Sequence, residues 1–426
     1  MSPIDLRDAP HNNGESDLED AMKYLTILIA SFLLISHASA DVLDVPGEYL
    51  TIQSAIQAAV DGDTIAIATG SYPEFGIDPS GLAITIEGAT NIDGSPAVTI
   101  DGQQADAVLI CQSGEDTSTI FRNLVITNGD SNTGGGLFLS NGSSPRFENC
   151  GIEGNSSARG GGVYCINNCN PHFQDCWFDS NQADIDGGGF YSLLNCDPVL
   201  VNCTFTNNQV SSSQFAFGGG MYNRDNSNPQ LTNCLFRNNQ AISPFSSGGA
   251  IANTESSPML IDCVLESNTT GGAGGGMSNT GASCQPVLTG CLILGNSSTN
   301  GGGLSFSLDA TGQVTDCEVS TNTATNGGGL FSVSGGNPSV SGTLLCGNSP
   351  DQVNGDWTDQ GSNEILESCP DCPGDATGDG YVDVNDVLYV ISAWDTPDPN
   401  ADFDNDGLVD ADDVLILLSH YGETCD

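Results

Sequence analysis

The residues with the clearest chemistry in this sequence form two twelve-residue segments near its C-terminal end. The first runs from Asp375 to Asp386 (DATGDGYVDVND) and the second from Asp402 to Asp413 (DFDNDGLVDADD). Both place oxygen-bearing side chains at positions 1, 3, 5, 9 and 12, and both have glycine at position 6. Oxygen ligands at this spacing, with a glycine that permits a sharp turn, are typical of calcium-binding loops.

We therefore predict that this part of the chain binds two calcium ions, one in each loop. Position 7 is expected to contribute its backbone carbonyl and the other positions their side chains. The predicted ligands are Asp375, Thr377, Asp379, Tyr381, Asp383 and Asp386 in the first loop, and Asp402, Asp404, Asp406, Leu408, Asp410 and Asp413 in the second.

Each loop leads into an apolar segment with helical spacing, Val387–Trp394 after the first and Val414–Tyr421 after the second. Chance carboxylates would not reproduce both the ligand spacing and the following helix twice. A module of about 50 residues has a small core, so calcium is expected to drive its folding.

Two features depart from the EF-hand pattern: aspartate stands at position 12, and no helix clearly precedes either loop. In both respects residues 373–424 are similar to type I dockerin modules. This resemblance implies docking to a cohesin domain through loop positions 10 and 11, which here are Val384-Asn385 and Ala411-Asp412 rather than the common hydroxyl pair. Thr377 also replaces the usual asparagine or aspartate at position 3, so a weaker first loop is expected.

A second periodic pattern occupies the middle of the chain and must form the body that carries this module. Eight glycine clusters recur at intervals of 26 to 31 residues. A fixed period of this length indicates a repeat architecture. The clusters are Gly134–Gly136, Gly160–Gly162, Gly187–Gly189, Gly218–Gly220, Gly248–Gly249 followed by Ala250, Gly274–Gly276, Gly301–Gly303 and Gly327–Gly329.

Each period also contains a cysteine that stands five residues before an asparagine. The cysteines are Cys150, Cys176, Cys203, Cys234, Cys263, Cys291 and Cys317, and the asparagines are Asn155, Asn181, Asn208, Asn239, Asn268, Asn296 and Asn322. The asparagine column extends to Asn128 and Asn348, with Asn123 and Thr343 in the cysteine position. Most periods place a proline between the glycines and the cysteine, as at Pro171.

The segments after the glycines, after the proline and after the cysteine are short and strand-like, which predicts coils of three strands. Stacked coils place equivalent positions about 4.8 Å apart, so like side chains pile up along the axis. Asparagine tolerates a left-handed backbone and bonds its neighbours above and below, which suits a column at a bend. The cysteines are expected to form a buried ladder of free thiols, because cysteine packs as a small hydrophobe.

The segment VPGEYLTIQSAIQAAVDGDTIAIATGSYPE (residues 45–74) resembles the opening of pectate-lyase-like right-handed parallel β-helix proteins, in which a short helix caps the first coil. The glycine clusters and blocks such as Phe205–Asn208 and Phe236–Asn239 resemble the repeats of polymorphic outer-membrane adhesins. These resemblances imply an all-β, right-handed parallel β-helix of about 10–11 coils over residues 41–350, a linker over 351–371 and a small α-helical, dockerin-like module over 372–426.

Strand alternation predicts a surface on this rod that binds a ligand. The first residue after each glycine cluster is apolar and should point inward, so the next should point outward. On four consecutive coils the outward residues are Phe138, Tyr164, Tyr191 and Tyr222. Exposed stacked rings would suit a polysaccharide lying along the rod, although an aromatic ladder also stabilises a sheet without any ligand.

The longest inserts in the repeat are Val210–Phe217 and Ala241–Ser247, on adjacent coils. They contain Phe215, Phe217 and Phe245, which adds aromatic rings next to the predicted strip.

No catalytic residue is predicted. Lyases of the β-helix superfamily typically use a lysine or arginine base beside acidic calcium ligands, and no lysine follows residue 40. His172 and His420 lack an evident nucleophile partner. Arg159, Asp184 and Asp186 could act as acid and base if they converge in a groove. The alternative to a carbohydrate-binding or adhesive rod is therefore a polysaccharide lyase or glycoside hydrolase, and a surface-layer role is a third hypothesis.

Charge excludes some partners. The chain has 54 acidic against 7 basic residues and a formal net charge of −47. Nucleic-acid binding needs a basic patch, so it is excluded, and an anionic membrane surface is an equally poor partner.

Residues 1–40 predict export. A short basic region at Met22, the probable start, precedes the apolar run Tyr24–Ile35, and Ala38–Ala40 fits a cleavage site after Ala40. The mature chain is therefore expected to be secreted, without a transmembrane segment.

Export permits disulfides. We expect Cys169 to pair with Cys196 across adjacent coils, and Cys372 with Cys425 to clasp the C-terminal module. Cys369 and Cys372 form a CxxC motif without the partner pair that a zinc site needs.

Overall fold

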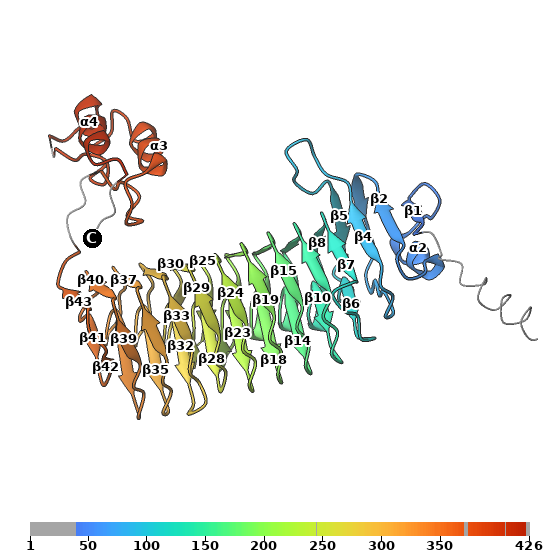
Figure 1. Ribbon diagram of the computed structural model, residues 1–426, viewed down its shortest axis with the longest axis horizontal. Helices are drawn as coiled ribbons and strands as arrows, with labels where there is room; N and C mark the ends of the chain where they lie inside the picture. Colours follow the sequence, from blue (N-terminus) through green and yellow to red (C-terminus); the bar gives the residue numbers. More distant parts are fainter. Residues whose placement is uncertain (1–39, 244, 370–373, 405, 423–426) are drawn as a thin grey trace, which may run out of the picture.

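The computed structural model describes residues 40–243, 245–369, 374–404 and 406–422. The chain winds into a parallel β-solenoid of about 11 coils, stacked in chain order (Figure 1). The described helices are α2 (Ile52–Ala58), α3 (Val384–Ser392) and α4 (Ala411–Ser419). The predicted all-β solenoid with a small helical part is therefore confirmed. The predicted signal region, residues 1–40, lies outside the described residues except for Ala40.

Three parallel sheets run along the rod, and each follows one repeated feature of the sequence. The post-proline sheet contains β1 (Val42–Val45), β2 (Thr64–Ile67), β4 (Thr85–Gly88), β7 (Ile120–Arg122), β11 (Arg146–Glu148), β15 (His172–Gln174), β19 (Val199–Val201), β24 (Gln230–Thr232), β29 (Met259–Ile261), β33 (Val287–Thr289), β36 (Gln313–Thr315), β39 (Ser339–Ser341) and β42 (Thr358–Asp359). The post-glycine sheet contains β6 (Leu109–Cys111), β10 (Leu137–Leu139), β14 (Val163–Ile166), β18 (Phe190–Leu193), β23 (Met221–Arg224), β28 (Ile251–Thr254), β32 (Met277–Thr280), β35 (Leu304–Ser307), β38 (Leu330–Val333) and β41 (Val353–Asn354). The post-cysteine sheet contains β3 (Gly70–Tyr72), β5 (Val98–Asp101), β8 (Val125–Thr127), β12 (Gly151–Glu153), β16 (Trp177–Asp179), β20 (Thr204–Thr206), β25 (Leu235–Arg237), β30 (Val264–Glu266), β34 (Leu292–Leu294), β37 (Glu318–Ser320), β40 (Leu344–Cys346) and β43 (Glu364–Leu366).

A fourth set of strands, the pre-glycine sheet, was not expected from the sequence. Its segments are short and mixed in character, and they pair in parallel from coil to coil. The strands are β9 (Asp130–Thr133), β13 (Ser156–Arg159), β17 (Gln182–Asp186), β21 (Gln209–Ser211), β22 (Phe215–Phe217), β26 (Gln240–Ile242), β27 (Phe245–Ser247) and β31 (Thr269–Thr270).

Equivalent residues stack through the interior, as expected for a coil repeat. Phe205 lies between Phe178 and Phe236, with ring centroids 4.3 and 4.4 Å away and nearly parallel rings. Each such pair contributes about 0.5–1.5 kcal/mol beyond the apolar area that it buries. The cysteine column is buried as free thiols, which confirms the predicted ladder. At the N-terminal end, α2 covers the first coil with Ile52 and Ile56.

The asparagine column forms a continuous chain of buried amides. The side-chain oxygen of Asn239 accepts hydrogen bonds from the backbone N–H and the amide nitrogen of Asn208, at 3.1 and 2.9 Å. The amide nitrogen of Asn239 donates to the carbonyl of Phe205 (2.8 Å) and to the side-chain oxygen of Asn268 (3.0 Å). Each asparagine therefore ties its coil to both neighbours.

The left-handed backbone does not lie at the asparagines of the column, as the sequence suggested, but one residue earlier. Asn207 and Asn238, for example, have φ of 56° and 57°. In the first repeat, the residue at the column position is therefore one later in the chain than the sequence predicted. Asn128 occupies the left-handed corner (φ 55°), and Gly129 donates its amide to Asn155 from the column position. The extension of the column to Asn128 was therefore wrong, whereas its extension to Asn348 is confirmed.

The glycine clusters are turns, one in each coil. Gly160 has φ of 63°, which residues with a Cβ adopt at a cost. A Cβ on Gly161 would overlap the carbonyl oxygen of Gln182 in the next coil. The clusters therefore exist because the coils approach closely at this corner.

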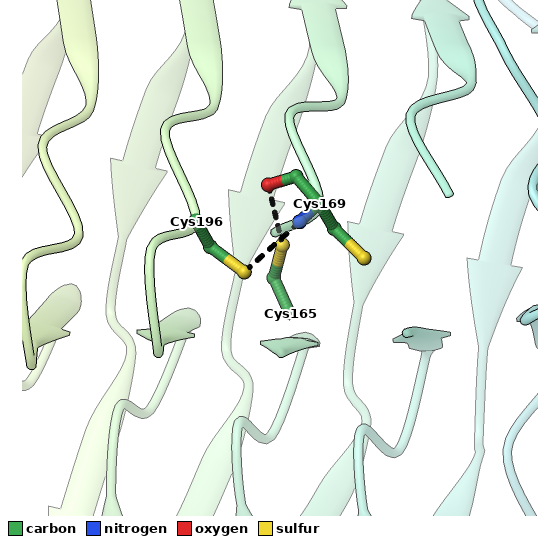
Figure 2. Close-up of side chains that lie close together, drawn as sticks. All are labelled: Cys165, Cys169 and Cys196. Carbon is green, nitrogen blue, oxygen red and sulfur yellow. Dashed lines mark hydrogen bonds between the residues drawn. The ribbon is translucent and has the colours of Figure 1, made fainter. Parts of the chain in front are cut away.

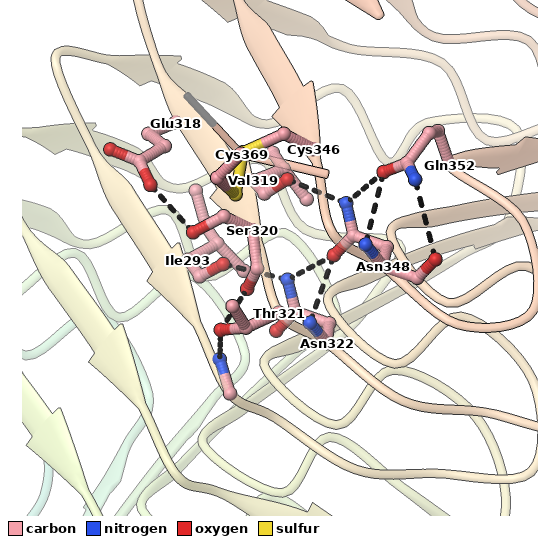
Figure 3. The surroundings of a disulfide bond; sticks show 11 residues. Ile293, Glu318, Val319, Ser320, Thr321, Asn322, Cys346, Asn348, Gln352 and Cys369 are labelled. Carbon is pink, nitrogen blue, oxygen red and sulfur yellow. Dashed lines mark hydrogen bonds between the residues drawn. A yellow bond between two sulfur atoms is a disulfide. The ribbon is translucent and has the colours of Figure 1, made fainter. Parts of the chain in front are cut away.

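The rod continues past residue 350, where the sequence predicted a linker. Strands β41, β42 and β43 extend the three long sheets by one further coil. Gln352 ends the amide column by accepting from the side chain of Asn348 at 2.6 Å, and a Cys346–Cys369 disulfide lies beside it (Figure 3). Within the described residues, no helix combines the length and apolar character needed to cross a membrane.

Replacing Asn239 by alanine should destabilise the rod. The substitution leaves the Phe205 carbonyl and two donors of Asn208 without their partner, and each buried unsatisfied group costs about 1–3 kcal/mol. We expect the free energy of unfolding to fall by at least about 3 kcal/mol in denaturant titrations. Asn132→Ala, at an exposed asparagine of β9, is the control. A loss no larger than that of the control would contradict a role of the ladder in stability.

Candidate functional site

In their described residues, the two predicted calcium loops share a pattern of hydrogen bonds to the first aspartate. In the first, the carboxylate of Asp375 accepts hydrogen bonds from the amides of Asp379 (3.1 Å) and Gly380 (2.9 Å). In the second, the carboxylate of Asp402 accepts from the equivalent amides of Asp406 and Gly407 at the same distances. The first residue of each loop thus organises the turn around its own side chain.

Each loop joins its helix through a capping box. Asp383 is the N-cap of α3 and accepts from the amide of Asn385 at 2.6 Å, while its own amide donates to Asp386 at 2.8 Å. Asp410 and Asp413 repeat these contacts at the start of α4. Acceptors at the N-terminus of a helix satisfy its unpaired amides.

Three carboxylates converge in each loop. One oxygen from each of Asp375, Asp379 and Asp386 lies within 4.8 Å of the other two, and Asp402, Asp404 and Asp413 form the second such cluster. Asp386 and Asp413 are fully buried. Burial, with a further contribution from the neighbouring carboxylates, raises the pKa of Asp375.

An all-oxygen cluster of mutually repelling carboxylates, one or two of them buried, fits Ca²⁺, whose ligand distances of about 2.3–2.6 Å allow ligand oxygens this far apart. Six of the predicted ligands are therefore brought together. Thr377 donates its hydroxyl to Asp386 at 2.8 Å, so it lies beside the first cluster. Asp383 and Asp410 face the helix N-termini, and Asp406 accepts from the amide of Leu408. The carbonyls of Tyr381 and Leu408 remain predicted ligands.

The two helices present matching apolar faces to solvent. Val384, Leu388 and Ile391 of α3 are 54%, 60% and 55% exposed. Leu415 and Leu418 of α4, which occupy the same places one repeat later, are exposed to a similar degree. The small core of the module lies on the opposite faces, around Val382, Val390, Val409 and Leu417.

On the rod, the predicted aromatic strip is not exposed. Tyr164, Tyr191 and Tyr222 are 7%, 1% and 3% exposed. They pack on one another: Tyr191 and Tyr222 are stacked at 5.1 Å, and the ring of Tyr164 meets that of Tyr191 edge to face at 5.3 Å. Phe138, Ile166, Leu193 and Phe217 pack around them. The expectation of open rings was wrong because it considered strand alternation without these neighbours.

The open aromatic rings lie instead on the two inserts. Phe215 and Phe245 are 50% and 66% exposed, and their ring centroids are 5.8 Å apart. The same inserts line a hollow of about 540 Å³ with the polar side chains of Ser212, Gln240 and Ser243. The sequence had already singled out these inserts by their length and their phenylalanines, but it placed the main aromatic surface on the strip beside them.

The proposed acid and base residues do not converge. Arg159 forms an ion pair with Asp186 at 3.1 Å, and Asp186 is buried. Burial raises the pKa of Asp186, although the hydrogen bond and charge of Arg159 oppose the shift. Asp184 is exposed and lines a different hollow with Asp106 and Asp130. Regular alternation would place residues 184 and 186 on one face, but β17 contains one extra residue relative to β13 between Ala183 and Asp186, and this irregularity separates the two carboxylates.

The predicted Cys169–Cys196 disulfide is not formed, because both residues are free, buried thiols in the structure. The disulfide present joins Cys346 and Cys369. The predicted Cys372–Cys425 pair lies outside the described residues.

Comparison with known proteins agrees with the fold. The family model described as "Right handed beta helix region" matches residues 77–217 and 184–345. Similar solved structures include the catalytic domain of Agl-KA (TM-score 0.40, 10% identity, 78% of this chain and 69% of that chain). Others are the A-module of mannuronan C-5 epimerase AlgE4 from Azotobacter vinelandii (0.38, 14%, 74% and 95%) and pectate lyase Pel9A (0.35, 11%, 78% and 79%). The sequence has no match among curated proteins. At these identities the likeness concerns the fold alone.

The raised pKa of Asp186 predicts a pH-dependent effect of the Asp186→Asn substitution. The folded chain holds this proton more tightly than the unfolded chain, so wild-type stability falls as the pH rises from the ordinary aspartate pKa of 3.8 through the raised value. The asparagine variant lacks this loss. The melting temperature of the wild type minus that of the variant should therefore decrease between pH 3 and pH 7. An equal decrease for Asp184→Asn, the exposed carboxylate of the same strand, would contradict the assignment.

Proposed function

This chain belongs to the right-handed β-helix family, and within that family we propose that it is an exported, non-catalytic, carbohydrate-binding or adhesive rod that docks to a partner through a calcium-binding, dockerin-like module. The observation that carries the docking part is the duplicated loop. Both copies gather three carboxylates and lead into a helix with an exposed apolar face. Calcium, when bound, supplies positive charge that holds these carboxylates together.

The chain's own residues prepare this module for a partner. Asp383 and Asp410 fix the starts of α3 and α4. The exposed residues Val384 and Leu388 on one helix, and Leu415 on the other, form matching surfaces that a cohesin domain would cover. The proposed export rests on residues 1–40, and the proposed partner on the resemblance to dockerins.

Carbohydrate binding is assigned to the inserts. Phe215 and Phe245 offer open rings, and the neighbouring hollow offers hydroxyl and amide groups. Flat apolar rings beside hydrogen-bonding groups match the two kinds of surface of a sugar ring. The alternative, a polysaccharide lyase or glycoside hydrolase, is not favoured, because Asp184 and Asp186 lie in different surroundings.

Calcium should stabilise the C-terminal module of the full-length protein. At a calcium concentration 100 times the dissociation constant, we expect the free energy of unfolding to increase by about 2.7 kcal/mol per site. Calorimetry should show an unfolding transition whose midpoint temperature rises when calcium is added and returns to its original value when a chelator is added. The double variant Asp386→Asn/Asp413→Asn should lose this response, whereas Asp395→Asn, outside both loops, should keep it. A transition insensitive to calcium in the wild type would refute the assignment.

Replacing both Phe215 and Phe245 by alanine should weaken binding on a glycan array by at least about tenfold, which corresponds to about 1.4 kcal/mol. Phe75→Ala is the control, because Phe75 is also 50% exposed but lies outside the inserts. The same glycans should be assayed for new reducing ends and unsaturated products. Product formation that disappears in Asp186→Asn would overturn the non-catalytic proposal.

A further inference from the structure

Three thiols meet inside the rod, away from the loops and surfaces described above. The sulfur atoms of Cys165, Cys169 and Cys196 lie within 4.8 Å of one another, and all three residues are 0% exposed (Figure 2). The straight ladder of Cys150, Cys176 and the cysteines that follow is different, because there each sulfur has neighbours only above and below.

Two inward-facing columns bring these thiols together. The first column is the third residue of the post-glycine strands, where Cys165 is the register partner of Ser192. The second column lies in the turn four residues later, where the amide of Cys169 donates to the sulfur of Cys196 at 3.3 Å. Two columns across two coils give a set of four side chains: Cys165, Cys169, Ser192 and Cys196.

The thiols of this set contact the backbone. The thiol of Cys165 donates to the carbonyl of Cys169 at 3.4 Å, and the thiol of Cys169 donates to the carbonyl of Ile166 at 3.2 Å. A bound metal ion would displace these protons, because the thiolate is the form that binds.

Ser192 supplies an independent observation. Its hydroxyl is fully buried and has no hydrogen-bond partner among the described residues. Ser332, which occupies the same register column further along the rod, also lacks a partner, so what distinguishes Ser192 is its place as the register partner of Cys165. An unsatisfied buried hydroxyl costs about 1–3 kcal/mol, so a ligand beside Ser192 would remove that cost.

We propose that Cys165, Cys169 and Cys196, together with the hydroxyl of Ser192, bind one zinc ion in the interior of the rod. Zinc takes four ligands in a tetrahedron and prefers thiolates. Zinc–sulfur bonds of about 2.3 Å place the sulfurs ~3.8 Å apart, so sulfurs that already lie within 4.8 Å of one another need only a small adjustment to bind the ion. Because all four positions are filled by the protein and the set is closed to solvent, the ion has a structural role and joins two coils.

Cobalt is the appropriate probe, because Co²⁺ replaces Zn²⁺ in tetrahedral thiolate sites and gives a sulfur-to-cobalt charge-transfer band. The oxygen-only calcium loops cannot give this band, so it separates the two kinds of site. Full-length protein should be refolded under reducing conditions with Co²⁺ and then passed through a chelating column. We expect one cobalt per chain, the charge-transfer band, and loss of the band on adding Zn²⁺.

Cys196→Ser should abolish the band. Cys284→Ser is the matched control, because Cys284 is a buried cysteine of the same turn column. Serine occupies this column naturally at Ser227 and Ser256, so both variants should fold. The idea is overturned if the wild type gives no band, if Cys196→Ser keeps it, or if non-reduced peptide mapping links two of Cys165, Cys169 and Cys196 by a disulfide. The presence or absence of the band in the wild type tests the proposal even if a variant fails to fold.

Discussion

The constraint on which this structure depends is the stacking of equivalent residues, coil on coil, along one axis. Buried amides enforce it most strongly. The side chain of an asparagine such as Asn239 donates to the coils on both sides and accepts from the preceding one, so a shifted coil would leave several buried polar groups without partners. Phenylalanine stacks, thiols and glycine turns follow the same register. The fold is therefore set less by individual strands, which are short, than by the agreement of every column with its neighbours.

A strict repeat is also uniform, so candidate functions lie where the repeat is broken. The inserts around Phe215 and Phe245 break it on the surface and leave aromatic rings in solvent. The columns at Cys165 and Cys196 break it in the interior. The coil with Leu139 and Ser143 is followed by one with Cys165 and Cys169 in the same two places, and the next coil has Ser192 and Cys196 there. In both places the repeating backbone supplies rigidity, and the exceptional side chains supply chemistry.

The C-terminal module follows a different physical rule. Its core is small, and its loops are shaped by carboxylates that accept hydrogen bonds from their own backbone. These carboxylates repel one another, so positive charge from a calcium ion would stabilise the arrangement that positions α3 and α4. Rod and module thus combine a scaffold that stabilises itself with a segment for which we propose that an ion supplies the missing charge.

The sequence by itself determined the features that depend on local spacing: the coil repeat, the thiol and amide ladders, and the two loops with their helices. Such features are readable because each period or loop repeats the same local geometry. Tertiary structure decided the environments that depend on neighbouring coils. Strand alternation places Tyr191 on the outward side, yet the rings of Tyr164 and Tyr222 on the neighbouring coils pack against its ring and bury it. Asp184 and Asp186 are two residues apart but lie in separate surroundings, and Asn128 falls one position away from its expected column. Cys165 joins Cys169 and Cys196 only because two columns run side by side, which no single period of the sequence reveals.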